Sequence, residues 1–170
     1  GSRSLTAPMT TPPADELQKY LWEMANSGCR SAVMEVSSHA LVQQRVRGVR
    51  FAVGIFTNLT QDHLDYHLSL EAYRDAKGLL FKGLSSRSIA VLNVDDPASE
   101  VYSKATSAMV ARYAIEGDAE VTAEIDRIDI DGSRFILKLG EERVPVASRL
   151  IGRHNVYNML AAATARFSIC

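Results

Sequence analysis

The chain has 170 residues, of which 46% are hydrophobic and 23% are charged, and this balance excludes an intrinsically disordered protein. The 19 Lys and Arg residues nearly cancel the 20 Asp and Glu residues, so the formal charge of -1 offers no basic field for nucleic acid or an anionic membrane. The longest apolar runs fall far short of the roughly 20 residues that a membrane-spanning helix needs. Two cysteines, Cys29 and Cys170, are too few for a disulfide framework or a zinc site. We therefore expect a soluble, cytoplasmic protein.

The two ends of the chain indicate a fragment. Gly1-Ser2 resembles the remnant of a cleaved tag, and we expect residues 1–9 to be this remnant and a linker. Residues 155–169 carry apolar positions at helical spacing, but the pattern stops at Cys170 without Gly, Pro or another signal that closes a helix. We therefore expect residues 10–170 to be part of one domain of a longer protein.

The first half of the chain alternates helical and apolar segments. Pro12 and Pro13 can begin a helix that ends near Asn26, because Pro is tolerated in the first helical turn. Residues 31–36 (SAVMEV) and 51–56 (FAVGIF) are short apolar runs with β-branched side chains, which predict buried strands. Each run ends in a polar cluster.

The second half continues this alternation and then changes. Residues 89–94 (IAVLNV) predict a third strand, with Asp96 as the N-cap of a following helix and Pro97 as its first residue. Alternating apolar residues around 121–147, separated by glycine turns, predict a small antiparallel sheet. Together these segments indicate an α/β fold with a mostly parallel sheet flanked by helices. Ligands of such folds gather at the carboxyl ends of the strands, where the polar clusters lie.

A lysine interrupts the apolar face of the helix expected over residues 69–84. Leu70, Tyr73, Lys77 and Leu80 are spaced three and four apart, so they lie on one face. Lys77 can simply extend its amine past the edge of the core. Alternatively, it faces a site, where burial lowers the pKa of the amine and makes the neutral, nucleophilic form available. The spacing leaves both interpretations open.

A cluster of aspartates and histidines follows the second predicted strand. Asp62, His63 and His67 can ligate a metal ion, or they can satisfy the backbone groups of a loop. Glu35 lies near the end of a predicted apolar strand, where an unpaired carboxylate is costly and needs a cation or a hydrogen-bond donor. Oxygen ligands combined with a histidine and no cysteine fit magnesium or manganese better than structural zinc.

Two asparagines lie three residues apart at the start of the last helix. Asn155 can cap this helix, or the amides of Asn155 and Asn158 can donate and accept together, as recognition of a purine edge requires. The motifs G-x-x-x-x-G-K-[ST], G-x-G-x-x-G and G-x-S-x-G do not occur in the sequence. The residues alone therefore indicate only a metal-assisted α/β site.

Six segments, in order along nearly the whole chain, resemble the central domain of the Mur ligases, which is similar to the P-loop NTPases. They are Thr10-Thr11-Pro12, MEVSSHAL at 34–41 with Gln43 and Arg45, TNL at 57–59 with DHLDYH at 62–67, Tyr73 with Ala76-Lys77, LNVDD at 92–96, and GRHNVYN at 152–158. The match is closest to the branch that adds a diamino acid to UDP-MurNAc-dipeptide. The resemblance implies a cytoplasmic, ATP-dependent step of peptidoglycan synthesis.

The resemblance also implies the reaction and the residues that bind the acceptor. ATP would phosphorylate the D-glutamate side chain of UDP-MurNAc-L-Ala-D-Glu, and the amine of a diamino acid would attack the acyl phosphate to form an amide. Arg45 suits a carboxylate or phosphate because its guanidinium can form two parallel hydrogen bonds. The residues that would contact UDP-MurNAc-dipeptide are Thr10, Thr11, Ser37, Gln43 and Arg45.

The family pattern further assigns the catalytic residues, the ions and the nucleotide. Glu35 and His63 would hold magnesium, which neutralises charge on the transferring phosphoryl group. Lys77 would be carbamoylated by carbon dioxide, and the carbamate would support a second magnesium ion. The residues that would contact ATP, the last of them a loose assignment, are Asn155, Asn158 and Asp95.

Parts of the family pattern are missing from these residues. They are the Gly-rich P-loop, the N-terminal UDP-binding domain and the C-terminal domain that selects the diamino acid. We therefore expect the 170 residues alone to be inactive. A sheet without its P-loop strand exposes an unpaired apolar edge, so we also expect self-association of the fragment, but no nucleic-acid or membrane partner.

Three alternatives stay open. The same fold can serve another Mur ligase or a folylpolyglutamate synthetase-like ligase, although the segment from Ser37 to Arg45 argues against both. The chain can also be a non-catalytic folding or interaction module. The last alternative is a metal hydrolase built on Asp62, His63 and His67.

Overall fold

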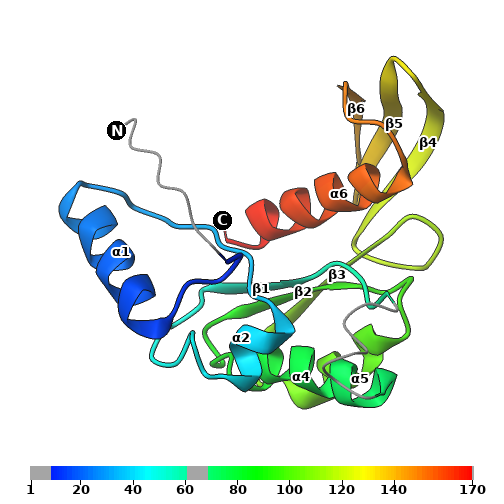
Figure 1. Ribbon diagram of the computed structural model, residues 1–170. Helices are drawn as coiled ribbons and strands as arrows, with labels where there is room; N and C mark the ends of the chain where they lie inside the picture. The colour runs from blue at the N-terminus through cyan, green and yellow to red at the C-terminus, as the bar shows by residue number, and fades with distance from the viewer. Residues whose placement is uncertain (1–8, 61–68, 170) are drawn as a thin grey trace. The chain divides into compact units, whose positions relative to one another are not determined.

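The computed structural model of the chain describes residues 9–60 and 69–169 (Figure 1). The chain forms two compact units, which we call the first and the second unit. The first unit contains residues 1–50 and 63–79, and the second contains residues 51–62 and 80–170. None of the described helices combines the length and the apolar character that crossing a lipid bilayer requires.

Helix α1 (Ala14–Asn26) of the first unit begins where the two prolines predict it. Its first turn carries Asp15 and Glu16, and negative charge is favourable there because the N-terminus of a helix carries partial positive charge. Leu17 is the buried residue of the apolar face. Gly28 follows the helix with a φ of +83°, a conformation that glycine adopts at little steric cost.

The strand predicted for residues 31–36 is wrong. No strand among the described residues pairs with this segment, and Val33 is 99% exposed. A strand is stable only when a neighbour takes up its N–H and C=O groups, and an apolar sequence does not supply that neighbour. Glu35 is therefore exposed, so the argument that burial requires a cation beside it does not hold. The polar cluster after this segment forms the short helix α2 (Ser38–Val42).

The second unit contains a six-stranded sheet in the order β1-β2-β3-β4-β5-β6 (Figure 1). Strands β1 to β4 pair in parallel, and β4 to β6 pair antiparallel. This arrangement confirms the predicted α/β class and the antiparallel part. The strands are β1 (Val53–Phe56), β2 (Ile89–Asn93), β3 (Met109–Ala114), β4 (Val121–Asp129), β5 (Gly132–Leu139) and β6 (Glu142–Ser148).

Three helices accompany the sheet. They are α5 (Ala98–Ala105), α6 (Arg153–Ser168) and the end of α4 (Leu70–Lys82). Helix α4 crosses the boundary between the units after Leu79. Its bounds confirm the helix predicted over 69–84.

Strand β2 is covered on both faces. All five of its residues are buried. Ile89 and Val91 belong to the apolar cluster that includes α6 and the antiparallel strands. Ala90 and Leu92 belong to a second cluster, which includes α5 and the end of α4. A strand in this position needs apolar residues on both sides, which is why β2 is a continuous apolar run in the sequence.

The sequence analysis does not predict strand β3. Its sequence mixes the exposed Met109 and the charged Arg112 with the buried Tyr113 and Ala114, so it lacks a continuous apolar run. Only two residue pairs join β3 to β4. The sheet changes from parallel to antiparallel pairing beyond this short contact.

We expect Gly132→Ala to destabilise the second unit more than Gly140→Ala. Gly132 is the first residue of β5, directly after the turn from β4, and Gly140 lies in the turn between β5 and β6. Gly132 has a φ of +132°, and a Cβ atom there would overlap with the backbone oxygen of Ser148. Gly140 has a φ of +55°, but a Cβ atom would meet nothing within 4 Å. The free energy of unfolding should fall by about 3 kcal/mol for Gly132→Ala and by about 1 kcal/mol for Gly140→Ala, measured by urea denaturation. Equal losses would contradict the steric argument.

Candidate functional site

A buried hydroxyl organises the residues of the first unit that are predicted to bind substrate. Thr11 is 1% exposed. Its Oγ1 donates to the backbone oxygen of Glu35 over 3.0 Å and accepts the backbone N–H of Ser37 over 3.1 Å. A buried hydroxyl that both donates and accepts is costly to remove. Thr11 therefore fixes the course of the chain from Glu35 to Ser37.

Ser37 begins helix α2, and a sharp turn follows that helix. The Oγ of Ser37 accepts the N–H of Ala40 over 3.2 Å, which satisfies a donor of the first helical turn. Gln44 then adopts a φ of +56°, a conformation that non-glycine residues rarely adopt. The N–H of Arg45 donates to the backbone oxygen of Ala40 over 2.8 Å and closes the turn. The turn directs Arg45 toward Thr11.

The guanidinium of Arg45 is held by neutral acceptors. Its Nε and Nη2 donate to Oε1 of Gln43 over 2.9 and 2.6 Å, and its Nη1 donates to the backbone oxygen of Thr11 over 2.9 Å. Nη1 also lies 3.3 Å from Sδ of Met9. Within the described ranges, no carboxylate forms an ion pair with Arg45. The positive charge is therefore oriented but not compensated, which suits an anionic ligand.

This network contains four of the five residues predicted to contact UDP-MurNAc-dipeptide. They are Thr11, Ser37, Gln43 and Arg45. Thr10, the fifth, is exposed and precedes Thr11 in the chain. The sequence analysis proposed these residues from resemblance alone, and the hydrogen bonds supply the physical reason for their proximity.

The predicted metal ligands are only partly described. Glu35 is exposed and offers a carboxylate, the ligand type that magnesium prefers. Lys77 is half-buried on α4, with its Nζ 5.1 Å from the centre of the Tyr73 ring. His63 lies outside the described residues, as do Asp62 and His67. Among the residues that the structure does describe, no group of three or more His, Cys, Asp or Glu side chains could hold a metal ion. The described donors fit magnesium in type but do not form a complete site.

In the second unit, Asp95 follows β2 and accepts four hydrogen bonds. Its Oδ2 accepts the N–H groups of Ile115 and Glu116 over 2.7 and 3.1 Å. The same oxygen accepts the hydroxyl of Tyr157 over 2.8 Å, and Oδ1 accepts the N–H of Gly117 over 2.7 Å. Burial acts to raise the pKa of this carboxyl, but the four donors outweigh it and hold the pKa below its ordinary value. The carboxylate joins the end of β2 to the β3–β4 loop and to α6.

Asp96 makes a separate set of contacts. Its Oδ1 accepts the N–H of Ala98, the first residue of α5, over 2.9 Å. Helix α5 begins at Ala98, one residue later than the sequence predicts, and its N-cap is Pro97 and not Asp96. The Oδ2 of Asp96 accepts the N–H of Leu59 over 2.6 Å. This second bond fastens the segment that follows β1.

Two further side chains hold the end of β1, and the sequence analysis misses both roles. Asn93 is 4% exposed, and its Nδ2 donates to the backbone oxygen of Thr57 over 2.8 Å. The hydroxyl of Tyr113 donates to the backbone oxygen of Phe56 over 3.0 Å. Burial raises the pKa of this phenol, which keeps it a donor at neutral pH. If β3 is predicted as a strand, Tyr113 is expected at this end of the sheet.

The first turn of α6 presents Asn155 and Asn158 on one face. The N-cap of α6 is Gly152, which has a φ of +99° and provides no side-chain cap. The alternative in which Asn155 caps the helix is therefore wrong. Its Nδ2 instead donates to the backbone oxygen of Ile151 over 2.9 Å, and its Oδ1 lies 3.5 Å from Nδ2 of Asn158. Asn158 is exposed.

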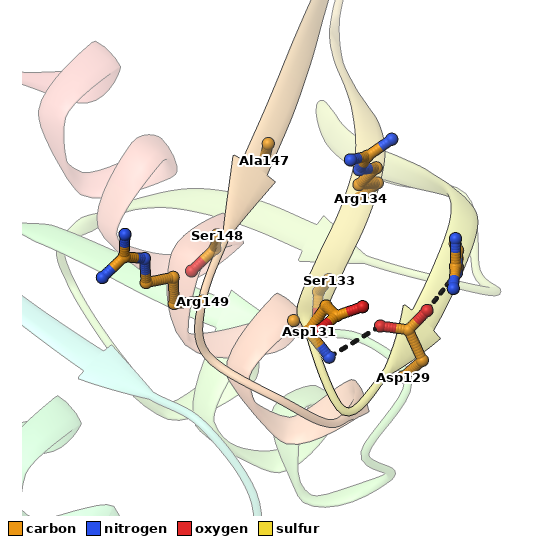
Figure 2. Close-up of a pocket in the computed structure, with 9 residues that line it drawn as sticks. Asp129, Asp131, Ser133, Arg134, Ala147, Ser148 and Arg149 are labelled. Carbon is orange, nitrogen blue, oxygen red and sulfur yellow. Dashed lines mark hydrogen bonds and ion pairs between the residues drawn. The ribbon is translucent and has the colours of Figure 1, made fainter.

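A cavity of about 200 Å³ lies beside the turn between β4 and β5, and it contains none of the predicted site residues. Figure 2 shows Asp129 accepting the backbone N–H of Asp131 over 2.9 Å, and the same side chain forms an ion pair with Arg127. Arg134 and Arg149 also line this space (Figure 2). Because its acidic and basic groups partly neutralise one another, this cavity is not the candidate site.

Two relatives share nearly the whole chain. A protein of Halalkalibacterium halodurans named UDP-N-acetylmuramoyl-L-alanyl-D-glutamate--2,6-diaminopimelate ligase is 49% identical over 161 residues, which cover 93% of this chain and 33% of that protein. A protein of Geobacillus kaustophilus with the same name is 46% identical over 171 residues, which cover 97% of this chain and 35% of that protein. The chain thus spans about a third of the length of these relatives.

Solved structures agree with this similarity. A structure of UDP-N-acetylmuramoyl-L-alanyl-D-glutamate--2,6-diaminopimelate ligase matches with a TM-score of 0.84 and 32% identity, over 98% of this chain and 35% of that chain. A crystal structure of MurF from Acinetobacter baumannii matches with a TM-score of 0.63 and 22% identity, over 69% of this chain and 26% of that chain, and supports the fold alone. The family described as Mur ligase middle domain matches residues 1–166. The chain therefore belongs to the Mur ligase family and represents its middle domain.

Proposed function

We propose that residues 10–170 are part of the ATP-binding middle domain of a longer ligase that adds 2,6-diaminopimelate to UDP-MurNAc-L-Ala-D-Glu. Mur ligases use ATP and Mg²⁺. The names of the relatives that are 49% and 46% identical support this choice of substrates. The observation that carries the proposal is the Arg45 guanidinium, which the Thr11 network orients and which no carboxylate among the described residues neutralises.

The proposed reaction has two steps. The γ-phosphoryl group of ATP passes to a side-chain carboxylate oxygen of D-glutamate, and ADP leaves. The amine of 2,6-diaminopimelate then attacks the acyl carbon. The C–O bond to phosphate breaks with its electron pair, the amine loses a proton, and an amide and inorganic phosphate remain.

The first unit would bind the acceptor substrate. Arg45 would pair with an anionic group of UDP-MurNAc-dipeptide, and its bonds to Gln43 and Thr11 reduce the entropy that the long side chain loses on binding. Thr10 and Ser37 flank this guanidinium network and would contact the same substrate. Orientation of the carboxylate before phosphoryl transfer is the contribution that these residues would make.

Magnesium and a modified lysine belong to the same proposal. When bound, Mg²⁺ neutralises charge on the transferring phosphoryl group. Glu35 and His63 would hold this ion. Lys77 as an ammonium would repel a nearby cation, whereas carbamoylation by carbon dioxide converts its positive charge into a negative one. The half-buried position of Lys77 beside Tyr73, on the apolar face of α4, supports this assignment.

The second unit would bind the nucleotide. Asn155 and Asn158 lie on one face of the first turns of α6, and their amides can donate to and accept from the edge of adenine.

Among the described strands, β1 pairs only with β2. Its other edge is where the expected self-association would take place, and that association stays a prediction.

We expect Arg45→Lys in the complete ligase to raise KM for UDP-MurNAc-dipeptide by about tenfold or more, because an ammonium cannot donate to Gln43, Thr11 and a ligand in the geometry of a guanidinium. KM for ATP should not change. The measurement is phosphate release at varied substrate concentrations, with the 170 residues alone as a background that we expect to show no turnover.

The matched control for this variant is Arg47→Lys. Arg47 lies two residues further along and also donates to a neighbouring glutamine, Gln44, over 3.1 Å, but it does not contact Thr11. This variant should keep the KM for UDP-MurNAc-dipeptide of the wild type. An equal rise of KM in both variants would refute the proposed role of Arg45.

We expect Lys77→Met to reduce kcat of the complete ligase by about a hundredfold or more, because methionine keeps the apolar stem but cannot form a carbamate. Lys82→Met, at an exposed lysine near the end of the same helix, is the control and should retain activity. Carbon-13 NMR after incubation with labelled bicarbonate should show a carbamate signal that Lys77→Met lacks. A fully active Lys77→Met variant would exclude the carbamate.

A further inference from the structure

The first turn of α6 is not fixed by a cap of its own. Its N-cap, Gly152, provides no side-chain acceptor, and no acidic residue lies in the first turn. A Cβ atom at Gly152 would lie 2.7 Å from the ring of His154, so a capping side chain cannot replace the glycine without moving that ring. Helix termini with unsatisfied N–H groups fray unless other contacts hold them.

Packing fixes the axis of α6 but acts from one side only. Val156 and Leu160 are fully buried in the cluster that faces β2. Asn155 and Asn158 lie on a more exposed part of the same turns. Holding these two amides in a constant position therefore requires contacts other than the apolar core.

Two contacts reach the first turns of α6, one from the β3–β4 loop and one from Asp95, which follows β2. Arg153 donates to Oε1 of Glu116 over 2.6 Å, but both side chains are largely exposed, so this ion pair contributes little. Tyr157 donates to Asp95, whose carboxylate is part-buried and charged. A hydrogen bond to a charged acceptor is roughly twice as strong as one between neutral groups. The Tyr157–Asp95 bond is thus the stronger link.

Asp95 is itself rigidly held. Three consecutive backbone N–H groups, those of Ile115, Glu116 and Gly117, donate to its two oxygens. The loop approaches so closely that a Cβ atom at Gly117 would lie 3.0 Å from Oδ1 of Asp95. A concave set of successive N–H groups is an anion-binding arrangement, and here the anion is the carboxylate of Asp95.

We propose that Asp95 is a positioning residue for the nucleotide, which acts through Tyr157 to hold the turn that presents Asn155 and Asn158 and does not contact the nucleotide itself. All four hydrogen bonds of this carboxylate come from the loop and from Tyr157, and three of them converge on Oδ2, so its contacts serve the link between the loop and α6. This inference rests on the proposed function only in taking the face of Asn155 and Asn158 as the nucleotide face. The link among Asp95, Tyr157 and the loop stands independently.

The kinetic test compares three variants of the complete ligase. Tyr157→Phe removes the hydroxyl that bonds to Asp95 and that also interacts with Arg153. Asp95→Asn replaces an acceptor oxygen by an amide group that cannot accept. Both should raise KM for ATP, by about tenfold for Asp95→Asn and less for Tyr157→Phe, with kcat within about twofold of the wild type. Asp96→Asn is the matched control, because it alters the neighbouring carboxylate, which bonds to Leu59 and Ala98 and not to α6. It should leave KM for ATP unchanged.

Each other kinetic result overturns the inference. A raised KM in Asp95→Asn combined with a normal KM in Tyr157→Phe would show that Asp95 contacts ATP directly. An equal rise in Asp96→Asn would show a general loss of stability rather than positioning. A normal KM in both Asp95→Asn and Tyr157→Phe would show that α6 does not need this link.

Hydrogen exchange tests the link without activity, so a failure of the proposed function is distinguishable from a failure of this inference. In the 170-residue chain, Tyr157→Phe should speed exchange of the amides of residues 115–117 and of the first turns of α6 by about tenfold, whereas Asp96→Asn should not. Unchanged exchange in Tyr157→Phe would overturn the inference even if the ligase proves active. If exchange is faster in Tyr157→Phe but the complete protein does not use ATP, the proposed function is wrong and the link between Asp95 and Tyr157 still holds.

Discussion

Burial of β2 on both faces determines where the polar chemistry of the second unit can lie. All five residues of this strand are buried, and apolar side chains from two clusters meet on it. An unpaired polar group within such a strand is costly, so polar side chains gather where the strand ends. Asn93, Asp95 and Asp96 lie there and hydrogen-bond to the segment after β1, the loop after β3, and helices α5 and α6. The arrangement proposed to bind the nucleotide follows from this packing constraint.

The same constraint explains which strands could be predicted from the sequence. The run around β2 is apolar because that strand is covered on both faces, whereas the run around β1 leaves Ile55 40% exposed. The alternation after residue 121 reflects an antiparallel sheet that packs on one face. Strand β3 is not predicted because its exposed Met109 and Arg112 interrupt the run of apolar residues. Residues 31–36 show the opposite error, since they are apolar but have no paired strand among the described residues. An apolar run in the sequence indicates side chains that favour burial, but a strand also needs a neighbouring strand that takes up its backbone hydrogen bonds.

The resemblance proposes site residues, but what each could do depends on contacts that spacing does not reveal. Thr11 and Ser37 are 26 residues apart and share one hydrogen bond. Arg45 is poised for an anion because its partners are neutral, which only the folded chain shows. Asp95 matched the family pattern as a nucleotide ligand, yet its four donors favour a positioning role. The sequence identifies which residue types are available. What each residue can do depends on which of its hydrogen-bond donors and acceptors are already used within the folded chain.

The proposed substrate-binding and nucleotide-binding residues divide between the two units. Thr11, Ser37 and Arg45 are connected inside the first unit, and Asp95 and Tyr157 are connected inside the second. Because hydrogen bonds within a single unit hold each set, neither network depends on contacts across the boundary for its internal geometry. Phosphoryl transfer requires the γ-phosphate and the acceptor carboxylate to meet in line, so the proposed reaction would need the residues of both networks.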